Sequence, residues 1–391
     1  MTHDHSGLRA RAVEIANDVA DRLGDPVRVA ERAAAAADLV GPTFELPLAH
    51  GHAGISLLFA ELARRDRKRE VGAHAHLTAC ATQLHGRSSP IGLFDGLAGL
   101  AFASRISSNS CEDYGNIGKV VGSHARFVAI RTDNAWSDRF DSGTPAVRAI
   151  DYDLISGLTG LGVYLLADEP RDYVALEHIV HALTLLARTR VIEGHEVPAW
   201  WNDQTDIPDH RYGQLDFSLA HGISGPLAFL SAALIADVEF PGQRETIDYL
   251  ATWLLRQRRV DGDDRPFWPR DLNFEQFTAT STAPPRRMLA WCWGNAGVAH
   301  SLRLAGRAMN HKEWVAEGVT TLLNAFDRID ETERIRDAGI CHGWAGLLQI
   351  MLRAAADGPT DTRVDNLVHR LAERTLECYN ADAPYLCAGA L

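Results

Sequence analysis

The chain has 391 residues, of which 46% are hydrophobic and 23% charged, a composition that suits a folded protein with a large core. Its formal net charge is −12 and its basic residues form no cluster, so we expect neither nucleic acid nor an anionic membrane as a partner. The chain opens without a signal-peptide pattern, and no stretch approaches the roughly 18 apolar residues of a membrane span, which predicts a cytoplasmic protein.

A Gly-x-x-Gly motif recurs along the chain, each time followed by an apolar run. The six motifs are Gly51/Gly54, Gly96/Gly99, Gly157/Gly160, Gly222/Gly225, Gly294/Gly297 and Gly343/Gly346. Gly389, close to the last residue, has the position of a seventh motif. A regular recurrence of this kind is typical of stacked supersecondary units, here of about 46 residues with insertions.

Each unit contains two helical patterns. The first follows the glycine motif and is apolar nearly all round, as in a helix buried on both sides. The second is amphipathic, as in residues 175–190, 245–259 and 314–329. Strand patterns are sparse, and the best are residues 27–30 and 126–131. The sequence therefore predicts an all-α fold, an α/α toroid of about seven helical hairpins, with residues 1–391 as one domain.

Three segments interrupt the regular spacing. Residues 104–150 are rich in Ser, Asn, Asp and Gly and are predicted to form a small lobe inserted in the toroid. Residues 193–216 and 261–287 are long polar loops with aromatic residues, which we expect at the rim of the barrel mouth on which the glycine motifs converge. Their tryptophans either contact a peptide or pack the loops down; these are Trp200, Trp201 and Trp268.

Two of the glycine motifs carry cysteines. The sequence WCWGNAG contains Cys292, and CHGWAG contains Cys341 and His342. Two thiolates and one imidazole form a zinc-binding set that leaves one tetrahedral position for a water or a substrate. No Cys-x-x-Cys pair occurs in the chain, which argues against a local zinc knuckle. The ligands are therefore predicted to come from two successive repeat units.

The WC-x-G-x-x-G and CHG motifs, on a Gly-x-x-Gly helical repeat, resemble the lanthionine synthetase C family, and the resemblance covers essentially the whole chain. It implies that zinc on Cys292, Cys341 and His342 binds a cysteine of a dehydrated precursor peptide. The thiolate then adds to dehydroalanine or dehydrobutyrine and closes a thioether ring. The resemblance is to stand-alone cyclases, which implies a precursor with a leader segment and a separate dehydratase as partners.

Two upstream motifs match the family's acid–base residues. The stretch from Tyr152 to Gly157 matches YD-x-x-x-G and implies that Asp153 lies near the zinc. Ala220, His221 and Gly222 match AHG and imply that His221 is the general acid/base, a role that suits an imidazole. From the residues alone, Asp153 is equally a helix N-cap and His221 a buried core histidine.

The chain departs from the family's pattern beside the first zinc cysteine. The family has an arginine four residues before this cysteine and a tyrosine directly after it. Here Met288 and Trp293 take these positions. Arg287 lies one residue further from the cysteine, and we predict that it reaches the mouth and stabilises the enolate; Arg286 is adjacent. Trp293 cannot accept a hydrogen bond or ionise, so we expect it to pack.

Two histidine pairs, His50/His52 and His74/His76, raise the question of a second metal. We expect these histidines to be solvated or capping residues instead.

The function that these observations predict is that of a zinc-dependent lanthionine-forming cyclase. Two alternatives are a member of the same superfamily that adds glutathione to dehydroamino acids in proteins, and a non-catalytic peptide-binding scaffold. A glycoside hydrolase on an α/α toroid needs paired carboxylates, and the Cys-Cys-His set argues against it.

Overall fold

The computed structural model describes residues 6–35, 48–84, 89–108, 115–203, 210–326, 335–357 and 361–383. Gly389, the predicted seventh motif, lies outside them. The chain divides into two compact units, and most of unit 1 is Thr132–Asp153 with Glu177–Ala390, whereas unit 2 is Arg9–Arg131 with Leu154–Leu176. Within the described ranges, no helix is both long and apolar enough to cross a membrane.

Unit 2 is built from helices that begin at successive glycine motifs. Helices α4, α6 and α9 start directly after Gly51, Gly96 and Gly157, and each packs against the next. Helix α5 packs on α4 as its hairpin partner. The elements are α1 (Ser6–Leu23), α2 (Pro26–Ala35), α4 (His52–Ala63), η1 (Arg67–Arg69), α5 (Glu70–Gln83), α6 (Leu97–Ser107) and α9 (Leu158–Ala167); α7 (Gly115–Asp141) and α10 (Tyr173–Thr184) cross the division.

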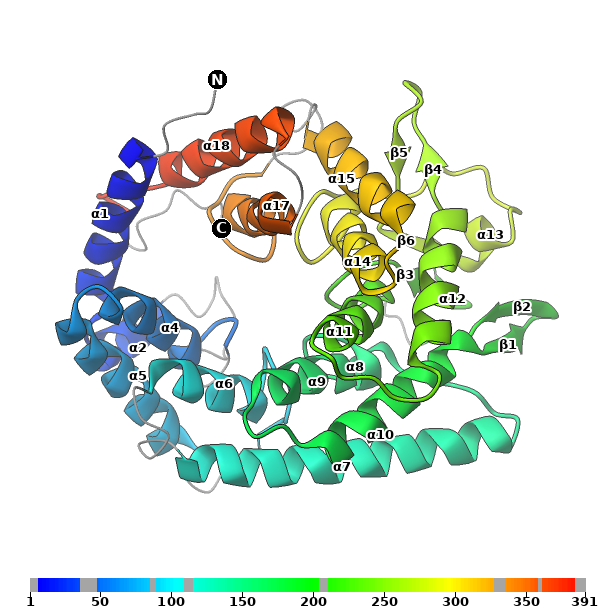
Figure 1. Cartoon of the computed structure of the whole chain (residues 1–391), viewed down its shortest axis with the longest axis horizontal. Coiled ribbons are helices and arrows are strands. Elements are labelled where there is room, and N and C mark those ends of the chain that lie inside the picture. The colour runs from blue at the N-terminus through cyan, green and yellow to red at the C-terminus, as the bar shows by residue number, and fades with distance from the viewer. Residues whose placement is uncertain are drawn as a thin grey trace. The chain divides into compact units, whose positions relative to one another are not determined.

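Unit 1 repeats this arrangement. Helices α11, α14 and α17 pack in order, and each forms a hairpin with the helix that follows it, as Figure 1 shows for α14 with α15 and for α17 with α18. The predicted amphipathic helices correspond to α10, α12 and α15. The elements are α8 (Ala149–Tyr152), η2 (Leu185–Ala187), α11 (Ser224–Ile235), α12 (Gln243–Arg256), α13 (Phe274–Phe277), α14 (Asn295–Ala308), α15 (Lys312–Phe326), α17 (Trp344–Asp357) and α18 (Thr362–Glu377).

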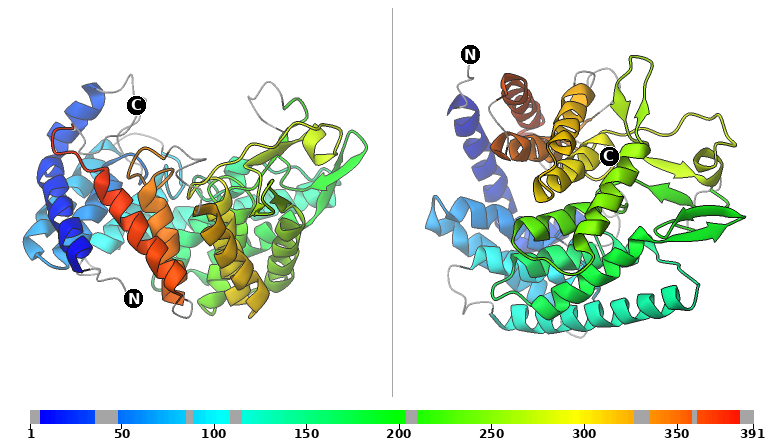
Figure 2. Two further views of the ribbon diagram at one scale, coloured as in Figure 1. Left: turned by 90° about the horizontal axis from the view of Figure 1, so that it is seen from above. Right: turned by 45° about the vertical axis from the view of Figure 1, so that its right-hand side comes forward.

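The long polar segments of unit 1 contain short strands that the sequence patterns did not predict. They form three antiparallel two-stranded ribbons, grouped on one side of this unit (Figure 2). The pairs are β1 (Thr189–Ile192) with β2 (His195–Pro198), β3 (Gln214–Asp216) with β6 (Asp271–Asn273), and β4 (Arg259–Val260) with β5 (Pro266–Phe267). Trp200, Trp201 and Trp268 are fully buried, so they pack these segments down.

The two strand patterns were wrong, because both segments are helical. Residues 27–30 lie in α2, where Asp25 accepts hydrogen bonds from the N–H groups of Val27 and Arg28 and Pro26 occupies the first helical position. Residues 126–131 lie in α7, whose buried face recurs every four residues at Val121, Ala125 and Ala129. Most of segment 104–150 is thus this one helix, and the inserted lobe stays a prediction.

At each glycine motif, the loop before the inner helix turns back and packs against the first turn of that helix. A Cβ atom on Gly346 would lie 1.9 Å from the carbonyl oxygen of Ile340 and 2.9 Å from the Cβ of Trp291. At Gly294 the backbone has φ +93° and a Cβ would lie 1.6 Å from the Met288 oxygen. Glycine is required at both positions, because any side chain would displace the loops that carry the motif cysteines.

One histidine of each pair, His52 and His76, is buried and not solvated as expected, whereas His50 and His74 are exposed. His52 and His76 are buried in unit 2, with their Nδ1 atoms 2.9 Å apart, and His76 Nε2 lies 2.7 Å from the Leu23 oxygen. If Nε2 of His76 carries a proton for this carbonyl, its Nδ1 accepts from His52. Burial and His76 lower the pKa of His52 to about 4. The pair is a neutral structural contact.

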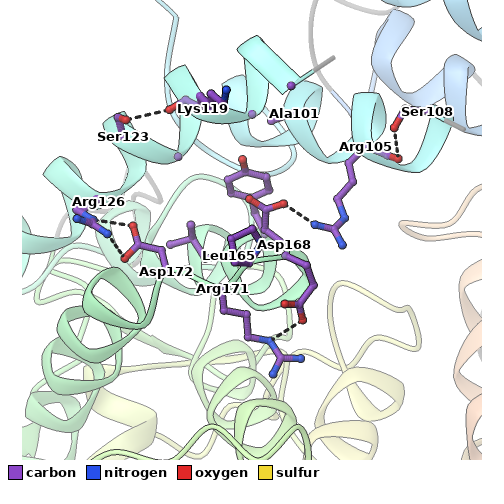
Figure 3. Close-up of a pocket in the computed structure, with 16 residues that line it drawn as sticks. Ala101, Arg105, Ser108, Lys119, Ser123, Arg126, Leu165, Asp168, Arg171 and Asp172 are labelled. Atoms are coloured by element: carbon purple, nitrogen blue, oxygen red, sulfur yellow. Dashed lines mark hydrogen bonds and ion pairs between the residues drawn. The ribbon is translucent and has the colours of Figure 1, made fainter. Parts of the chain in front are cut away.

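Unit 2 also contains a cavity of about 910 Å³ beside α7 (Figure 3). Arginines in its wall pair with carboxylates: Arg105 with Asp168, and Arg126 with Asp172 through both oxygens. Arg171 pairs likewise with Glu169. These guanidinium charges are matched within the wall, whose remaining basic residue is Lys119.

Candidate metal centre

The two cysteine motifs meet in unit 1. Cys292 precedes α14, and Cys341 and His342 precede α17. The sulfur atoms of both cysteines and a ring nitrogen of His342 all lie within 4.8 Å of one another. Cys292 is buried, whereas Cys341 and His342 are exposed. The group is therefore anchored on one side and open on the other.

Main-chain hydrogen bonds hold these loops in register. The N–H group of Cys292 donates to the carbonyl oxygen of Cys341 at 3.2 Å. The carbonyl oxygen of Cys292 accepts from Leu219 at 2.9 Å and from Ala220 at 3.2 Å. Three successive motif loops are thus joined through the backbone of one cysteine, and the next residue after Ala220 is His221.

The donor set suits zinc. Tetrahedral zinc with ligand distances of about 2.0–2.3 Å places its ligand atoms about 3.7 Å apart, so the observed group needs only a small contraction. The hydrogen bond between the two thiols lowers the pKa of Cys341 and raises the pKa of Cys292, whose burial acts in the same direction. Three soft or borderline ligands with one open side fit a catalytic rather than a closed structural zinc.

Asp153 and His221 form a hydrogen-bonded pair. Asp153 Oδ2 lies 2.7 Å from His221 Nδ1. Asp153 is only 2% exposed, whereas the His221 side chain is 41% exposed. Asp153 is not the N-cap of α9, because that position is held by Gly157, and His221 is not a core residue. Both simpler interpretations are excluded.

The surroundings of His221 favour its charged form. The hydrogen bond from Asp153 raises the pKa of His221 against the opposing effect of burial, and the charges of Asp153, Asp216 and Cys341 act in the same direction. A raised pKa makes this imidazole a better proton donor than an ordinary histidine, and a proton on Nδ1 directed at Asp153 leaves Nε2 for exchange.

Three residues that the sequence did not single out as a group are linked to His221 through the Trp293 ring. The Trp293 ring is 5.7 Å from the His221 ring, and its Nε1–H donates to Asp216 Oδ2 at 3.3 Å. The guanidinium carbon of Arg270 lies 4.3 Å from the Trp293 ring centroid. Burial raises the pKa of Asp216, although hydrogen bonds from Ser218 oppose it. Trp293 does pack, as expected, but it also donates a hydrogen bond.

The two arginines of the shifted motif have other contacts. Arg287 lies 4.1 Å above the Phe267 ring and 3.5 Å from Asp261. Arg286 binds both oxygens of Asp271, at 3.1 and 2.8 Å. Neither arginine has a recorded contact with Asp153, His221 or the cysteines in the portion of the chain that the structure describes. A catalytic role for Arg287 stays a prediction.

Comparison with known proteins agrees with this architecture. Residues 43–385 match the model of the lanthionine synthetase C-like protein family. The nisin biosynthesis protein NisC of Lactococcus lactis subsp. lactis is 22% identical over 315 residues, which cover 78% of this chain and 73% of that protein.

A solved structure of nisin cyclase has a TM-score of 0.72 with this chain, at 19% identity, and the match covers 93% of this chain and 90% of that one. The nisin cyclase fold is an α/α toroid, so the predicted fold class is confirmed. The match over residues 43–385 includes all six complete glycine motifs, from Gly51 to Gly346. The chain belongs to the lanthionine synthetase C-like family.

Proposed function

We propose that this protein is a zinc-dependent cyclase that forms lanthionine or methyllanthionine rings in a dehydrated precursor peptide. The observation that carries the proposal is the Cys292, Cys341 and His342 group, whose ligand atoms lie within 4.8 Å of one another on two family motifs. Membership of the lanthionine synthetase C-like family and the similarity to NisC support it. The substrate is a peptide that a separate dehydratase has treated and that carries a leader segment.

Each residue of the site has a defined task in this proposal. Cys292, Cys341 and His342 hold zinc, which when bound supplies a Lewis acid that keeps a substrate thiol deprotonated. Asp153 fixes the ring of His221 through Nδ1. His221 exchanges a proton through Nε2: the imidazolium delivers a proton to the α-carbon after sulfur has added to the β-carbon, and the neutral ring then takes up the proton that the next substrate thiol releases. The reaction is an isomerisation, so no atom is gained or lost.

The buried position of Asp153 makes this exchange effective. A carboxylate that is 2% exposed interacts with an imidazole through a medium of low polarity, so it favours the imidazolium more than a solvated carboxylate would. The exposed side of His221 is where a peptide reaches the ring. The open side of the Cys341 and His342 pair serves the same approach.

The test uses a peptide with one dehydroalanine and one cysteine. Because ring closure leaves the mass unchanged, the free thiol is counted with a thiol-alkylating reagent before and after incubation. We expect the thiol to disappear with the untreated protein, to persist with a zinc chelator, and to disappear again when zinc is restored.

A matched pair of variants separates the metal centre from cysteine loss in general. Cys292→Ala is expected to lose zinc and cyclisation, whereas Cys378→Ala, which removes a thiol at the end of α18, is expected to retain both. Full zinc content and cyclisation in Cys292→Ala contradict the proposal. Preferential addition of glutathione to the peptide favours the glutathione-adding alternative, and peptide binding without reaction favours a scaffold.

A further inference from the structure

Arg270 shares an aromatic ring with the acid–base histidine. Its guanidinium carbon lies 4.3 Å from the centroid of the Trp293 ring, and the His221 ring is 5.7 Å from the same centroid. Guanidinium groups bind well to the face of tryptophan. A permanent positive charge and the histidine of the site thus lie against the same indole.

The position of Arg270 is fixed by the backbone. Its N–H group donates to the Arg286 carbonyl oxygen at 2.8 Å, and its own carbonyl oxygen accepts from Phe217 at 3.4 Å. The following residue, Asp271, pairs with Asp216 in the β3–β6 ribbon. Asp216 in turn accepts the hydrogen bond of Trp293 Nε1. The same ribbon therefore carries Arg270 and the carboxylate that orients the indole beneath it.

The hydrogen-bonding capacity of Arg270 is largely unused. Both oxygens of the adjacent Asp271 accept from Arg286. Arg270 Nε lies 3.2 Å from Asp271 Oδ2 but makes no hydrogen bond with it. Over the ranges that the structure describes, no hydrogen bond of the Arg270 Nη groups is recorded, and the side chain is 29% exposed. Its Nε is buried, so the exposed part of the side chain lies elsewhere, and its Nη groups have no recorded acceptor within the described ranges.

We propose that Arg270 is a catalytic residue that donates hydrogen bonds to the carbonyl oxygen of the dehydroamino acid as the cysteine sulfur adds to it. The inference rests on the proposed cyclase function. A bond forms between sulfur and the β-carbon, the electron pair of the carbon–carbon double bond moves toward the carbonyl, and negative charge develops on its oxygen. His221 then protonates the α-carbon and restores the neutral amide. A charged donor interacts most strongly at the stage when this oxygen is negative.

The assignment differs from the one that sequence register suggested. Arg287 rests on Phe267 and is paired with Asp261, whereas Arg270 rests on the indole next to His221. The contact with Trp293, and not the sequence distance from Cys292, distinguishes Arg270 from Arg287.

The test compares Arg270→Gln with Arg188→Gln. Arg188 is a matched control because it is an arginine of the same unit whose guanidinium lies 5.4 Å from the Phe140 ring centroid. We expect kcat for ring closure to fall about 100-fold in Arg270→Gln, the usual effect of removing an oxyanion donor. KM is expected to stay within about twofold, because the interaction grows in the transition state. Arg188→Gln is expected to behave as the wild type.

Two readouts separate catalysis from structural support. Affinity for an inert peptide with alanine in place of dehydroalanine is expected to be unchanged in Arg270→Gln, and zinc content likewise. Added guanidinium at concentrations that leave the protein folded is expected to restore part of the activity of Arg270→Ala. Arg270→Lys, which keeps the charge but not the planar donors, is expected to fall between wild type and Arg270→Gln.

The proposal is overturned if Arg270→Gln retains wild-type kcat, or if its kcat and inert-peptide affinity decline together. A 100-fold loss in Arg287→Gln with none in Arg270→Gln overturns it in favour of the sequence-register assignment. If the wild type closes the ring and Arg270→Gln does so equally fast, only the role of Arg270 is contradicted. A wild-type protein that leaves the substrate thiol free contradicts the proposed cyclase function as well.

Discussion

Replacing Asp153 with asparagine removes one negative charge from the site with little change in volume. The carboxylate lies 2.7 Å from His221 Nδ1 and is 2% exposed, so its effect on the imidazole is not screened by water from its own side. Without it the pKa of His221 falls, because the hydrogen bond with Asp153 is the first cause of its elevation. A larger fraction of His221 is then neutral at pH 7 and unable to donate a proton.

We expect kcat of Asp153→Asn to fall about 100- to 1,000-fold at neutral pH, within the range that positioned acid–base groups contribute. The sign of the pH effect is fixed. Activity that needs protonated His221 is lost as pH rises through the pKa of His221, so lowering this pKa moves the alkaline limb of the kcat profile to lower pH. The free energy of unfolding is expected to fall by only about 1 kcal/mol, since the His221 side chain is 41% exposed and the charged hydrogen bond is partly screened.

The assay is a pH–rate profile of thiol loss for the wild type, Asp153→Asn and Asp133→Asn. Asp133 is a matched control, because it is also a buried carboxylate of unit 1 and accepts from two histidines, His178 at 2.7 Å and His181 at 2.6 Å. Asp133→Asn is expected to leave kcat and the alkaline limb unchanged. The reasoning is refuted if Asp153→Asn has a wild-type alkaline limb, or if the control shifts it equally.

Three further predictions address the metal, the loops and pH. His342→Gln is expected to weaken zinc binding by more than about 100-fold, measured by competition with a chromophoric chelator. Its far-UV circular dichroism spectrum is expected to stay unchanged. An unchanged zinc affinity would exclude His342 as a ligand. Gly346→Ala is expected to lower the free energy of unfolding, measured with urea, by about 1–3 kcal/mol, because its Cβ would lie 1.9 Å from a carbonyl oxygen. Gly118→Ala, on the open face of α7, is expected to raise it slightly. Equal effects of the two substitutions would contradict this reasoning. The contribution of neutral His52 to the free energy of unfolding is present at pH 7 and declines by up to about 3 kcal/mol as pH falls from about 6.5 to 4. His52→Gln is expected to reduce this dependence of the free energy of unfolding on pH.

The inner helices and the metal group were predictable because their signals are local. Helix α14 begins at Asn295, directly after the glycine that starts its motif, and α17 begins directly after Gly343. Each cysteine lies within two residues of such a glycine, so placing the motif loops side by side brings the ligands together. His221 directly precedes Gly222 and Asp153 lies before Gly157, but their place in the site was implied by the resemblance to the family, and their hydrogen bond was not predicted.

The remaining features depend on contacts between residues that are far apart in the chain. Trp293 and Asp216 are separated by 77 residues, and His52 and His76 by 24. No local sequence pattern therefore predicts either contact. The short strands have two to four residues each, below the length at which alternation is informative. In α7, the β-branched and aromatic residues of 126–131 suggested a strand, but Phe127 is exposed and the burial follows a helical period.

The backbone hydrogen bonds that join the loops of Cys292, Cys341 and Ala220 bear on how the protein matures. Because main-chain hydrogen bonds hold the loops of Cys292 and Cys341 against each other, the ligands need no large search once the chain has folded. If zinc is the ion, as proposed, we expect the chain to fold without it and to take it up afterwards without refolding. This also means that cobalt(II), whose visible spectrum reports its ligands, can be exchanged into the same protein to follow thiol binding directly.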